Sequence, residues 1–172
     1  ELSQRMPDEP YAGLPWTDLD SLYSAIFDDV LETASSLDSV SVYVLKTEQE
    51  YSIEFLSKHM PNIQILEFQN SSLNEQIRFS FETLFAKQYE QIVLLLEPNP
   101  LTTKQHLQTA FELLQYDDDA IVVGQNGNGN YYLIGLKSNH TDLFETDGQL
   151  DTLSKQFDLL ERVCENEIMI FP

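Results

Sequence analysis

The chain has 172 residues, 42% of them hydrophobic, with 29 acidic against 9 basic side chains and a net charge of −20. Such a charge repels nucleic-acid phosphates and anionic lipid surfaces, so we expect no nucleic acid as a partner. No apolar run approaches the roughly 18 residues that a membrane span needs, so we expect no membrane association. The one cysteine, Cys164, fits a reducing compartment, which predicts a cytoplasmic protein.

The first third of the chain alternates between helical and strand-like segments. Thr17 is expected to cap a helix, because an unbroken helical stripe of apolar residues follows from Leu19 to Ala34. The β-branched and aromatic run Val40 to Leu45 predicts a strand buried on both faces. A helix over Glu48 to His59 and a strand over Asn62 to Phe68 are expected next.

Two capping-box patterns mark later helices. Ser72 with Glu75 predicts a helix to about Lys87, and Thr102 with Gln105 predicts another to about Gln115. Between them, Gln91 to Leu96 is the most hydrophobic strand of the chain. The remaining predicted elements are strands over Ala120 to Gly124 and Tyr131 to Lys137, a helix over Leu150 to Asn166 and a strand over Glu167 to Phe171.

This alternation predicts one α/β domain over residues 1–172, with a three-layer, Rossmann-like architecture. Its sheet is expected to be mainly parallel, with helices on both faces. The Gly/Asn-rich segment Gly124 to Tyr131 joins two strands without a helix, so a hairpin or an antiparallel strand is expected there.

In open α/β sheets, ligands bind outside the carboxyl ends of the strands. Glu97 follows the strand Gln91 to Leu96 directly, where a carboxylate could hold a divalent metal ion and, through it, a diphosphate. Asn99 is the one neighbouring side chain that could assist, because Pro98 and Pro100 flank it. The alternative is that Glu97 is a solvated carboxylate at a strand end.

Two polar segments and one arginine allow more than one reading. The loop Gly124 to Asn130 could cradle an anion or a sugar hydroxyl with its backbone amides, or could serve only as a tight connection. Asp117 to Asp119 precede a strand, at the rim normally opposite the ligand, so they are interpreted as an acidic turn. Arg78 is interpreted as flanking a packed helix face, with a phosphate contact as the alternative.

Three stretches together resemble a known family. Val93 to Thr102 (VLLLEPNPLT) corresponds to V-x-x-G-S-D-C-P-D-L-T, which is one residue longer. Asp119 to Leu136 (DAIVVGQNGNGNYYLIGL) corresponds to D-x-V-x-G-P-x-x-D-G-G-Y-Y-L-I-G-L, which is one residue shorter. Leu143 to Glu145 matches its L-F-E. The chain thus resembles a bacterial glycosyltransferase-A family, of the D-C-P and D-G-G-Y-Y-L type, related to the MobA-like nucleotide-diphospho-sugar transferases.

The apolar frame of these stretches agrees with the family, while several polar positions depart from it. Glu97 and Pro100 replace two aspartates of the first stretch, and Asn128 and Asn130 replace the Asp and second Gly of D-G-G. The family's opening strand and nucleotide-binding loop would precede Glu1, so they either exist upstream or are absent.

The resemblance implies transfer of a sugar from a nucleotide-sugar donor, with Mg²⁺ or Mn²⁺ at Glu97. It places the substrate at the following residues: Asn99, Asn128, Gly129, Asn130 and Tyr131. The lost polar groups leave an alternative, a catalytically silent module that binds a sugar, a nucleotide or a protein on the same fold.

Overall fold

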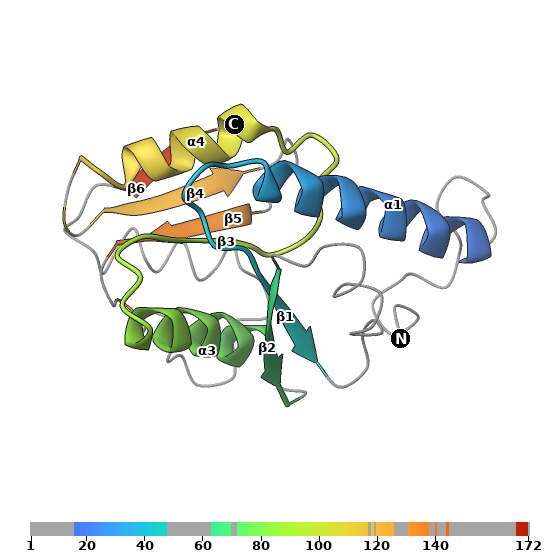
Figure 1. Cartoon of the computed structure of the whole chain (residues 1–172), viewed down its shortest axis with the longest axis horizontal. Coiled ribbons are helices and arrows are strands. Elements are labelled where there is room, and N and C mark those ends of the chain that lie inside the picture. Colours follow the sequence, from blue (N-terminus) through green and yellow to red (C-terminus); the bar gives the residue numbers. More distant parts are fainter. Residues whose placement is uncertain are drawn as a thin grey trace. The chain divides into compact units, whose positions relative to one another are not determined.

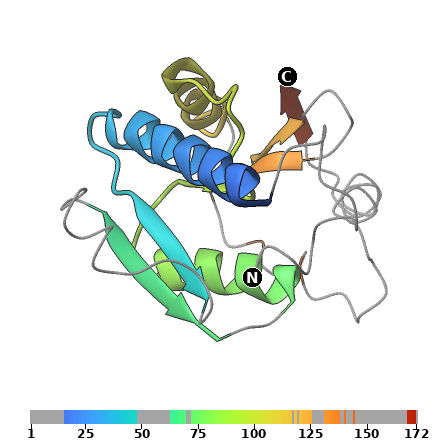
Figure 2. The ribbon, with the colours of Figure 1, turned by 90° about the vertical axis from the view of Figure 1, so that its right-hand side faces the viewer.

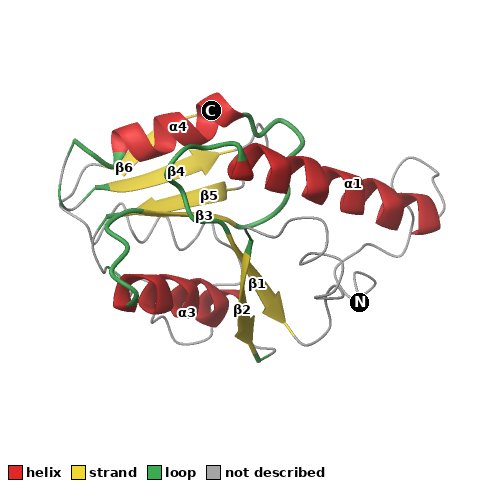
Figure 3. Cartoon of the chain, viewed as in Figure 1, coloured by secondary structure: helices red, strands yellow, loops and turns green. Residues whose placement is uncertain are grey.

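The computed structural model describes residues 16–47, 63–69, 72–116, 118, 120–125, 131–137, 140, 144 and 168–171 (Figure 1; Figure 3). The chain divides into two compact units. The first contains Glu1–Asn70 and Pro98–Lys104, and the second contains Ser71–Glu97 and Gln105–Pro172. The prediction of one domain over the whole chain is not tested by this division and stays a prediction.

The described residues of the first unit form a long helix and two parallel strands. Helix α1 spans Trp16–Ser35, and strands β1 (Tyr43–Thr47) and β2 (Gln64–Phe68) pair along their whole length. The two strands run side by side in both views (Figure 1; Figure 2). Leu31 of α1 and Val44 of β1 are buried together, and half-buried apolar side chains surround them: Phe27, Val42, Ile63 and Ile65.

Two local predictions in this unit need correction. Helix α1 begins at Trp16, so Thr17 lies inside the helix and not at its cap. The first amides of a helix have no partner within it, so its start can move by a residue at little cost. Strand β1 begins at Tyr43, three residues later than expected from Val40. Its bounds follow the partner strand, because Tyr43 pairs with Gln64 and Thr47 with Phe68.

The expected helix over Glu48 to His59 lies outside the described residues. At the other end of α1, the ammonium of Lys104 donates a 2.6 Å hydrogen bond to the carbonyl oxygen of Ser36. A positive charge is favourable there, because the last carbonyl groups of a helix carry partial negative charge and lack partners within the helix.

The second unit is built on a four-stranded sheet. Its order is β3 (Ile92–Leu95), β5 (Tyr131–Leu136), β4 (Ile121–Gln125) and β6 (Ile168–Phe171). Strand β5 is antiparallel to both of its neighbours, and β4 is parallel to β6. The antiparallel join expected at the Gly/Asn-rich segment is therefore confirmed. The expected helix over Leu150 to Asn166 lies outside the described residues.

Helices α3 (Leu73–Ala86) and α4 (Lys104–Leu113) lie on opposite sides of this sheet (Figure 1). Every residue of β5 and the first four residues of β4 are buried from solvent. The α/β, Rossmann-like architecture expected from the alternation of elements is confirmed. The side chains with the least exposure are Phe81, Ile77, Leu114, Ile121, Leu133, Ile134, Leu136, Val122, Val123 and Ser80.

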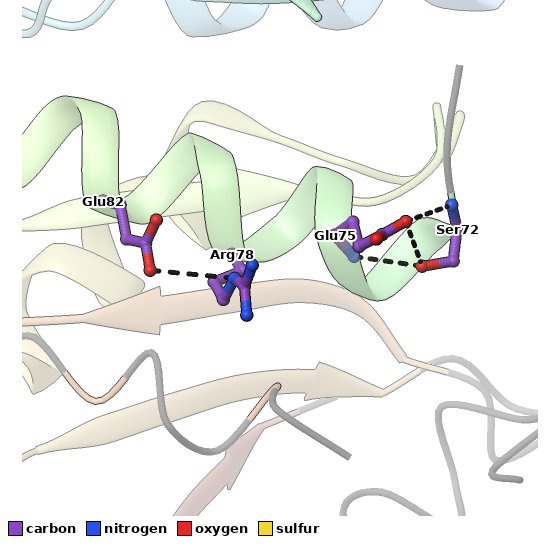
Figure 4. Close-up of polar contacts among 4 residues, drawn as sticks. All are labelled: Ser72, Glu75, Arg78 and Glu82. Carbon is purple, nitrogen blue, oxygen red and sulfur yellow. Dashed lines mark hydrogen bonds and ion pairs between the residues drawn. The ribbon is translucent and has the colours of Figure 1, made fainter. Parts of the chain in front are cut away.

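Helix α3 begins with the capping box that its sequence predicts. The Ser72 hydroxyl accepts a hydrogen bond from the Glu75 amide, and the Glu75 carboxylate accepts one from the Ser72 amide at 3.0 Å (Figure 4). Two of the amides that a helix start leaves unpaired are thereby satisfied. A cap of this kind contributes about 1 kcal/mol to stability.

The matching pattern at Thr102 and Gln105 does not form a capping box. Helix α4 begins at Lys104, and the buried Thr102 hydroxyl has no hydrogen-bond partner. The Thr102 amide instead donates 2.9 Å to the Asn99 carbonyl oxygen, which makes Thr102 the last residue of a turn. The capping prediction is wrong here because this turn, and not the helix, positions the Thr102 backbone.

Candidate functional site at the carboxyl edge of the sheet

The candidate site lies at the edge of the four-stranded sheet where β3 and β4 end and β5 begins. Pairing along β3 reaches Leu95 opposite Leu133. The Leu96 amide then donates a 2.9 Å hydrogen bond to the Tyr132 carbonyl oxygen. On the other side of β5, the last pair is Gln125 of β4 with Tyr131. Residues far apart in the sequence therefore meet at one edge.

Glu97 is the first residue beyond this pairing of β3. Its side chain is exposed, whereas β3 itself is buried to half-buried. Backbone pairing of Leu96 with Tyr132 holds the neighbouring residue, so the start of the loop that carries Glu97 is fixed to β5. The structure thus presents a carboxylate to solvent at the end of a buried strand, as the sequence predicts.

Asn99 is half-buried and organises the turn that follows Glu97. Its side-chain oxygen accepts a 2.9 Å hydrogen bond from the Leu101 amide, and its backbone oxygen accepts one from the Thr102 amide. An Asn side chain that bonds the backbone two residues on is a common stabiliser of turns. Such an oxygen keeps a second lone pair, so the bond leaves one direction for a ligand.

A bulge shapes the β4–β5 side of the edge. Gly124 pairs with Leu133 and Gln125 pairs with Tyr131, so Tyr132 has no partner on β4. The Tyr132 ring lies against Gly124: a Cβ atom placed there would be 2.9 Å from the ring and 3.0 Å from the Leu133 Cβ. Burial raises the pKa of Tyr132, because the ionised phenol would lose its hydration.

Glycine at position 124 therefore has a packing reason. Only a residue without a side chain accepts the Tyr132 ring at this distance. The two interpretations of the loop that starts at Gly124, a cradle for a ligand or a tight connection, stay predictions. The rest of the loop, with Asn128, Gly129 and Asn130, lies outside the described residues.

Tyr131 and Gln125 complete the described part of the edge. Tyr131 is 9% exposed, and Gln125 is half-buried after four buried residues of β4. Sequence reasoning selected Tyr131 but missed Gln125. A signal was present, because Gln125 is the first polar side chain after the apolar run that ends at Gly124, which is where a strand is expected to meet its ligand.

The acidic turn lies at the opposite edge of the same sheet. Asp118 precedes β4, and its carboxylate accepts a 2.6 Å hydrogen bond from the ammonium of Lys137, which follows β5. The hydrogen bond and the charge of Lys137 lower the pKa of Asp118. The contact ties the entrance of β4 to the exit of β5, in agreement with the interpretation as an acidic turn. Asp117 and Asp119 lie outside the described residues.

Replacement of Lys137 by methionine is expected to return the pKa of Asp118 to its ordinary range. Because the folded-state pKa is depressed, the ion pair stabilises the fold above the unfolded-state pKa and is lost as pH falls through the folded-state pKa. Carboxyl chemical shifts followed by NMR against pH measure this directly. A Lys46→Met control should leave the Asp118 curve unchanged, and an unchanged curve in Lys137→Met would contradict the assignment.

Arg78 is a further candidate, and it lies on a helix. Arg78 lies on α3 and contacts Glu82 one turn later at 3.7 Å, with both side chains substantially exposed (Figure 4). Exposed pairs of this kind contribute about 0–1 kcal/mol. Cys164 lies outside the described residues. Arg78 thus has a surface partner of its own on its helix.

Among the described residues, no group of three or more His, Cys, Asp or Glu side chains is arranged to hold a metal ion. A dedicated cage is not required for Mg²⁺, which usually binds one or two protein carboxylates together with substrate phosphates and water. The exposed Glu97 carboxylate meets the requirement of such a site for one protein carboxylate. None of the helices in the described part of the chain is both long and apolar enough to cross a membrane.

Solved structures share this architecture. A protein named as a candidate nucleotide-diphospho-sugar transferase from Desulfovibrio desulfuricans G20 is 21% identical, with a TM-score of 0.75 over 88% of this chain and 67% of that one. The 4-diphosphocytidyl-2C-methyl-D-erythritol synthase of Anaerococcus prevotii DSM 20548 is 12% identical, with a TM-score of 0.60 over 85% of this chain and 75% of its own. At these identities the likeness shows the fold, that of the nucleotide-diphospho-sugar transferases.

No curated protein matches the chain significantly. A family model described as "uncharacterized protein conserved in bacteria (DUF2064)" matches residues 30–147, which is well over half of the sequence. The match includes β1 to β5 and the whole candidate edge from Glu97 to Tyr131. The chain therefore belongs to this bacterial family.

Proposed function

We propose that the protein binds a nucleotide-sugar at the carboxyl edge of the four-stranded sheet and transfers its sugar to an acceptor. The observation that carries the proposal is the exposed Glu97 carboxylate, placed at the end of a buried strand and tied by backbone pairing to β5. The nucleotide-diphospho-sugar transferase fold supports it by analogy. The proposal includes membership of the D-C-P and D-G-G-Y-Y-L type, as a divergent member, and a cytoplasmic location.

A divalent cation would offset the repulsion between this acidic protein and an anionic donor. With a net charge of −20, the protein repels a free diphosphate. Mg²⁺ or Mn²⁺ held by Glu97 would neutralise the diphosphate and stabilise the charge that develops on it as its bond to the sugar breaks. The same local charge reversal would let an anionic donor approach an acidic protein.

The chain's own groups would bind and orient the donor. Glu97 would fix the diphosphate end through the cation, while Tyr131, together with Asn128, Gly129 and Asn130, would contact the sugar or the acceptor. In the transfer, the bond between the anomeric carbon and the phosphate oxygen breaks. The acceptor hydroxyl oxygen forms the new bond to that carbon, and its proton passes to the nucleoside diphosphate, which leaves with the electrons of the broken bond.

Thermal unfolding with a panel of donors tests the binding step: UDP-glucose, GDP-mannose, ADP-glucose and dTDP-glucose, each with and without Mn²⁺. A donor at a hundredfold excess over its dissociation constant should stabilise the protein by about 2.7 kcal/mol. The stabilisation should depend on the metal ion. If no donor produces a metal-dependent shift, the proposal is wrong.

Glu97→Gln is expected to weaken the metal-dependent binding at least tenfold, since contacts with a charged group contribute roughly 1.5–3 kcal/mol. Glu90→Gln is the matched control, because Glu90 is an exposed carboxylate beside the other end of β3. Titration calorimetry should show an unchanged dissociation constant for Glu90→Gln. Equal binding by Glu97→Gln and wild type would remove Glu97 from the metal site.

Release of nucleoside diphosphate from the bound donor, measured by chromatography, separates transfer from binding alone. A transferase is supported if nucleoside diphosphate is released faster with the protein than from the free donor in buffer. Glu97→Gln should abolish this faster release. Metal-dependent binding without any release would leave a binding module on the same fold, the alternative that the altered polar positions suggest.

A further inference from the structure

Gln125 occupies a position at the candidate edge to which no role is assigned. It is the last residue of β4, it pairs with Tyr131, and it is half-buried while the four residues before it are buried. The carboxyl end of a strand in an open α/β sheet is where ligands bind. Gln125 is therefore the point at which β4 first offers a polar side chain to that edge.

A bulge directly precedes this position. Tyr132 takes no partner on β4, its ring packs on Gly124, and its carbonyl oxygen accepts the Leu96 amide from the other side. Bulges next to functional sites commonly redirect a side chain or end the pairing of two strands. Here the pairing resumes for one residue pair only, Gln125 with Tyr131, directly beyond the bulge.

The order of the strands sets the distance to Glu97. Strand β5 lies between β3 and β4, so Gln125 and the end of β3 are separated by two strand spacings, about 10 Å. Tyr131 begins the strand between them. If the diphosphate of a ligand lies at Glu97, the group attached to that diphosphate can extend across β5. That group would then approach Gln125.

We infer that Gln125 binds the sugar of the nucleotide-sugar and contributes to its selection. The inference rests on the proposed function and assigns one group of that ligand to one residue. A glutamine amide has two N–H donors and two acceptor lone pairs, so it can bind a hydroxyl in either sense and keep a contact within the chain. A sugar offers hydroxyls that both donate and accept, whereas a diphosphate offers only acceptors.

The test compares UDP-glucose with UDP, both with Mn²⁺, by titration calorimetry on wild type and Gln125→Met. Methionine keeps the length of the side chain and removes its amide. We expect about five- to tenfold weaker binding of UDP-glucose, as for loss of one or two hydrogen bonds, and UDP binding unchanged within about twofold. Gln108→Met, a change of the same kind on the exposed side of α4, should leave both affinities unchanged.

The outcomes separate the two proposals. If another donor of the panel binds more tightly than UDP-glucose, that donor and its nucleoside diphosphate take the place of UDP-glucose and UDP. If Gln125→Met weakens both ligands equally or neither, Gln125 does not bind the sugar, and the proposed function stands. If the wild type binds no nucleotide-sugar from the donor panel, the proposed function fails and this inference falls with it. Thermal unfolding checks that Gln125→Met is folded. If Gln125→Met does not fold, Gln125→Leu takes its place in the same comparison.

Discussion

Replacement of Phe81 by alanine is expected to lower the free energy of unfolding by about 3–5 kcal/mol, the usual cost of deleting a buried aromatic ring. Phe81 is 0% exposed. Its ring stacks on Phe85 of the same helix at 6.2 Å and on Phe144 at 6.0 Å, with planes inclined by 22° and 9°. Removal of the ring leaves a cavity and takes away a contact between Phe144 and α3.

Urea unfolding followed by circular dichroism measures this loss. Tyr116→Ala is the control for removal of an aromatic ring, because Tyr116 is 82% exposed and its loss should change the stability by less than about 0.5 kcal/mol. Phe81→Leu keeps most of the apolar volume, so its loss of stability should lie between those of Phe81→Ala and Tyr116→Ala. A loss below about 1 kcal/mol in Phe81→Ala would contradict a central role for this ring in the core.

Gly124→Ala is expected to destabilise the protein by about 1–3 kcal/mol, the usual cost of inserting a carbon into a well-packed core. The added Cβ would lie 2.9 Å from the Tyr132 ring and 3.0 Å from the Leu133 Cβ, and the latter cannot move without its backbone. The expected structural response is a displaced Tyr132 ring and a weakened bulge.

A double-mutant cycle with Tyr132→Leu isolates this contact. Alanine at position 124 should cost less when the ring is absent, with a coupling energy of about 0.5–3 kcal/mol. Gly135→Ala is the matched control in the adjacent strand: its new Cβ would meet a Leu114 methyl group at 3.2 Å, the flexible end of a side chain. Additive effects of the Gly124 and Tyr132 substitutions would contradict direct packing of the ring on this glycine.

The capping boxes show how far local sequence predicts local structure. Ser72 with Glu75 and Thr102 with Gln105 have the same pattern, yet only the first forms the reciprocal hydrogen bonds. The difference lies in what precedes each helix. Asn99 organises a turn through its side-chain and backbone oxygens, and this turn takes the Thr102 amide away from a capping role.

At the candidate site too, the sequence predicts some features and not others. The place of Glu97 could be predicted, because the end of a strongly apolar strand in an alternating α/β sequence lies at the ligand edge of the sheet. The neighbours of Glu97 could not, since pairing of Leu96 with Tyr132 and of Gln125 with Tyr131 depends on the strand order. Gln125 follows the apolar run that ends at Gly124, a signal that the sequence contains, whereas its pairing with Tyr131 depends on the strand order.

The sequence by itself determined the alternation of helices and strands, the antiparallel join at the Gly/Asn-rich segment and the capping of α3. These features follow from hydrophobic periodicity and from contacts within a few residues. The tertiary structure alone decided the order β3-β5-β4-β6, the bulge at Tyr132 and the reason for glycine at position 124. Those features depend on which distant parts of the chain pack together. A local sequence pattern does not determine the energy of such packing.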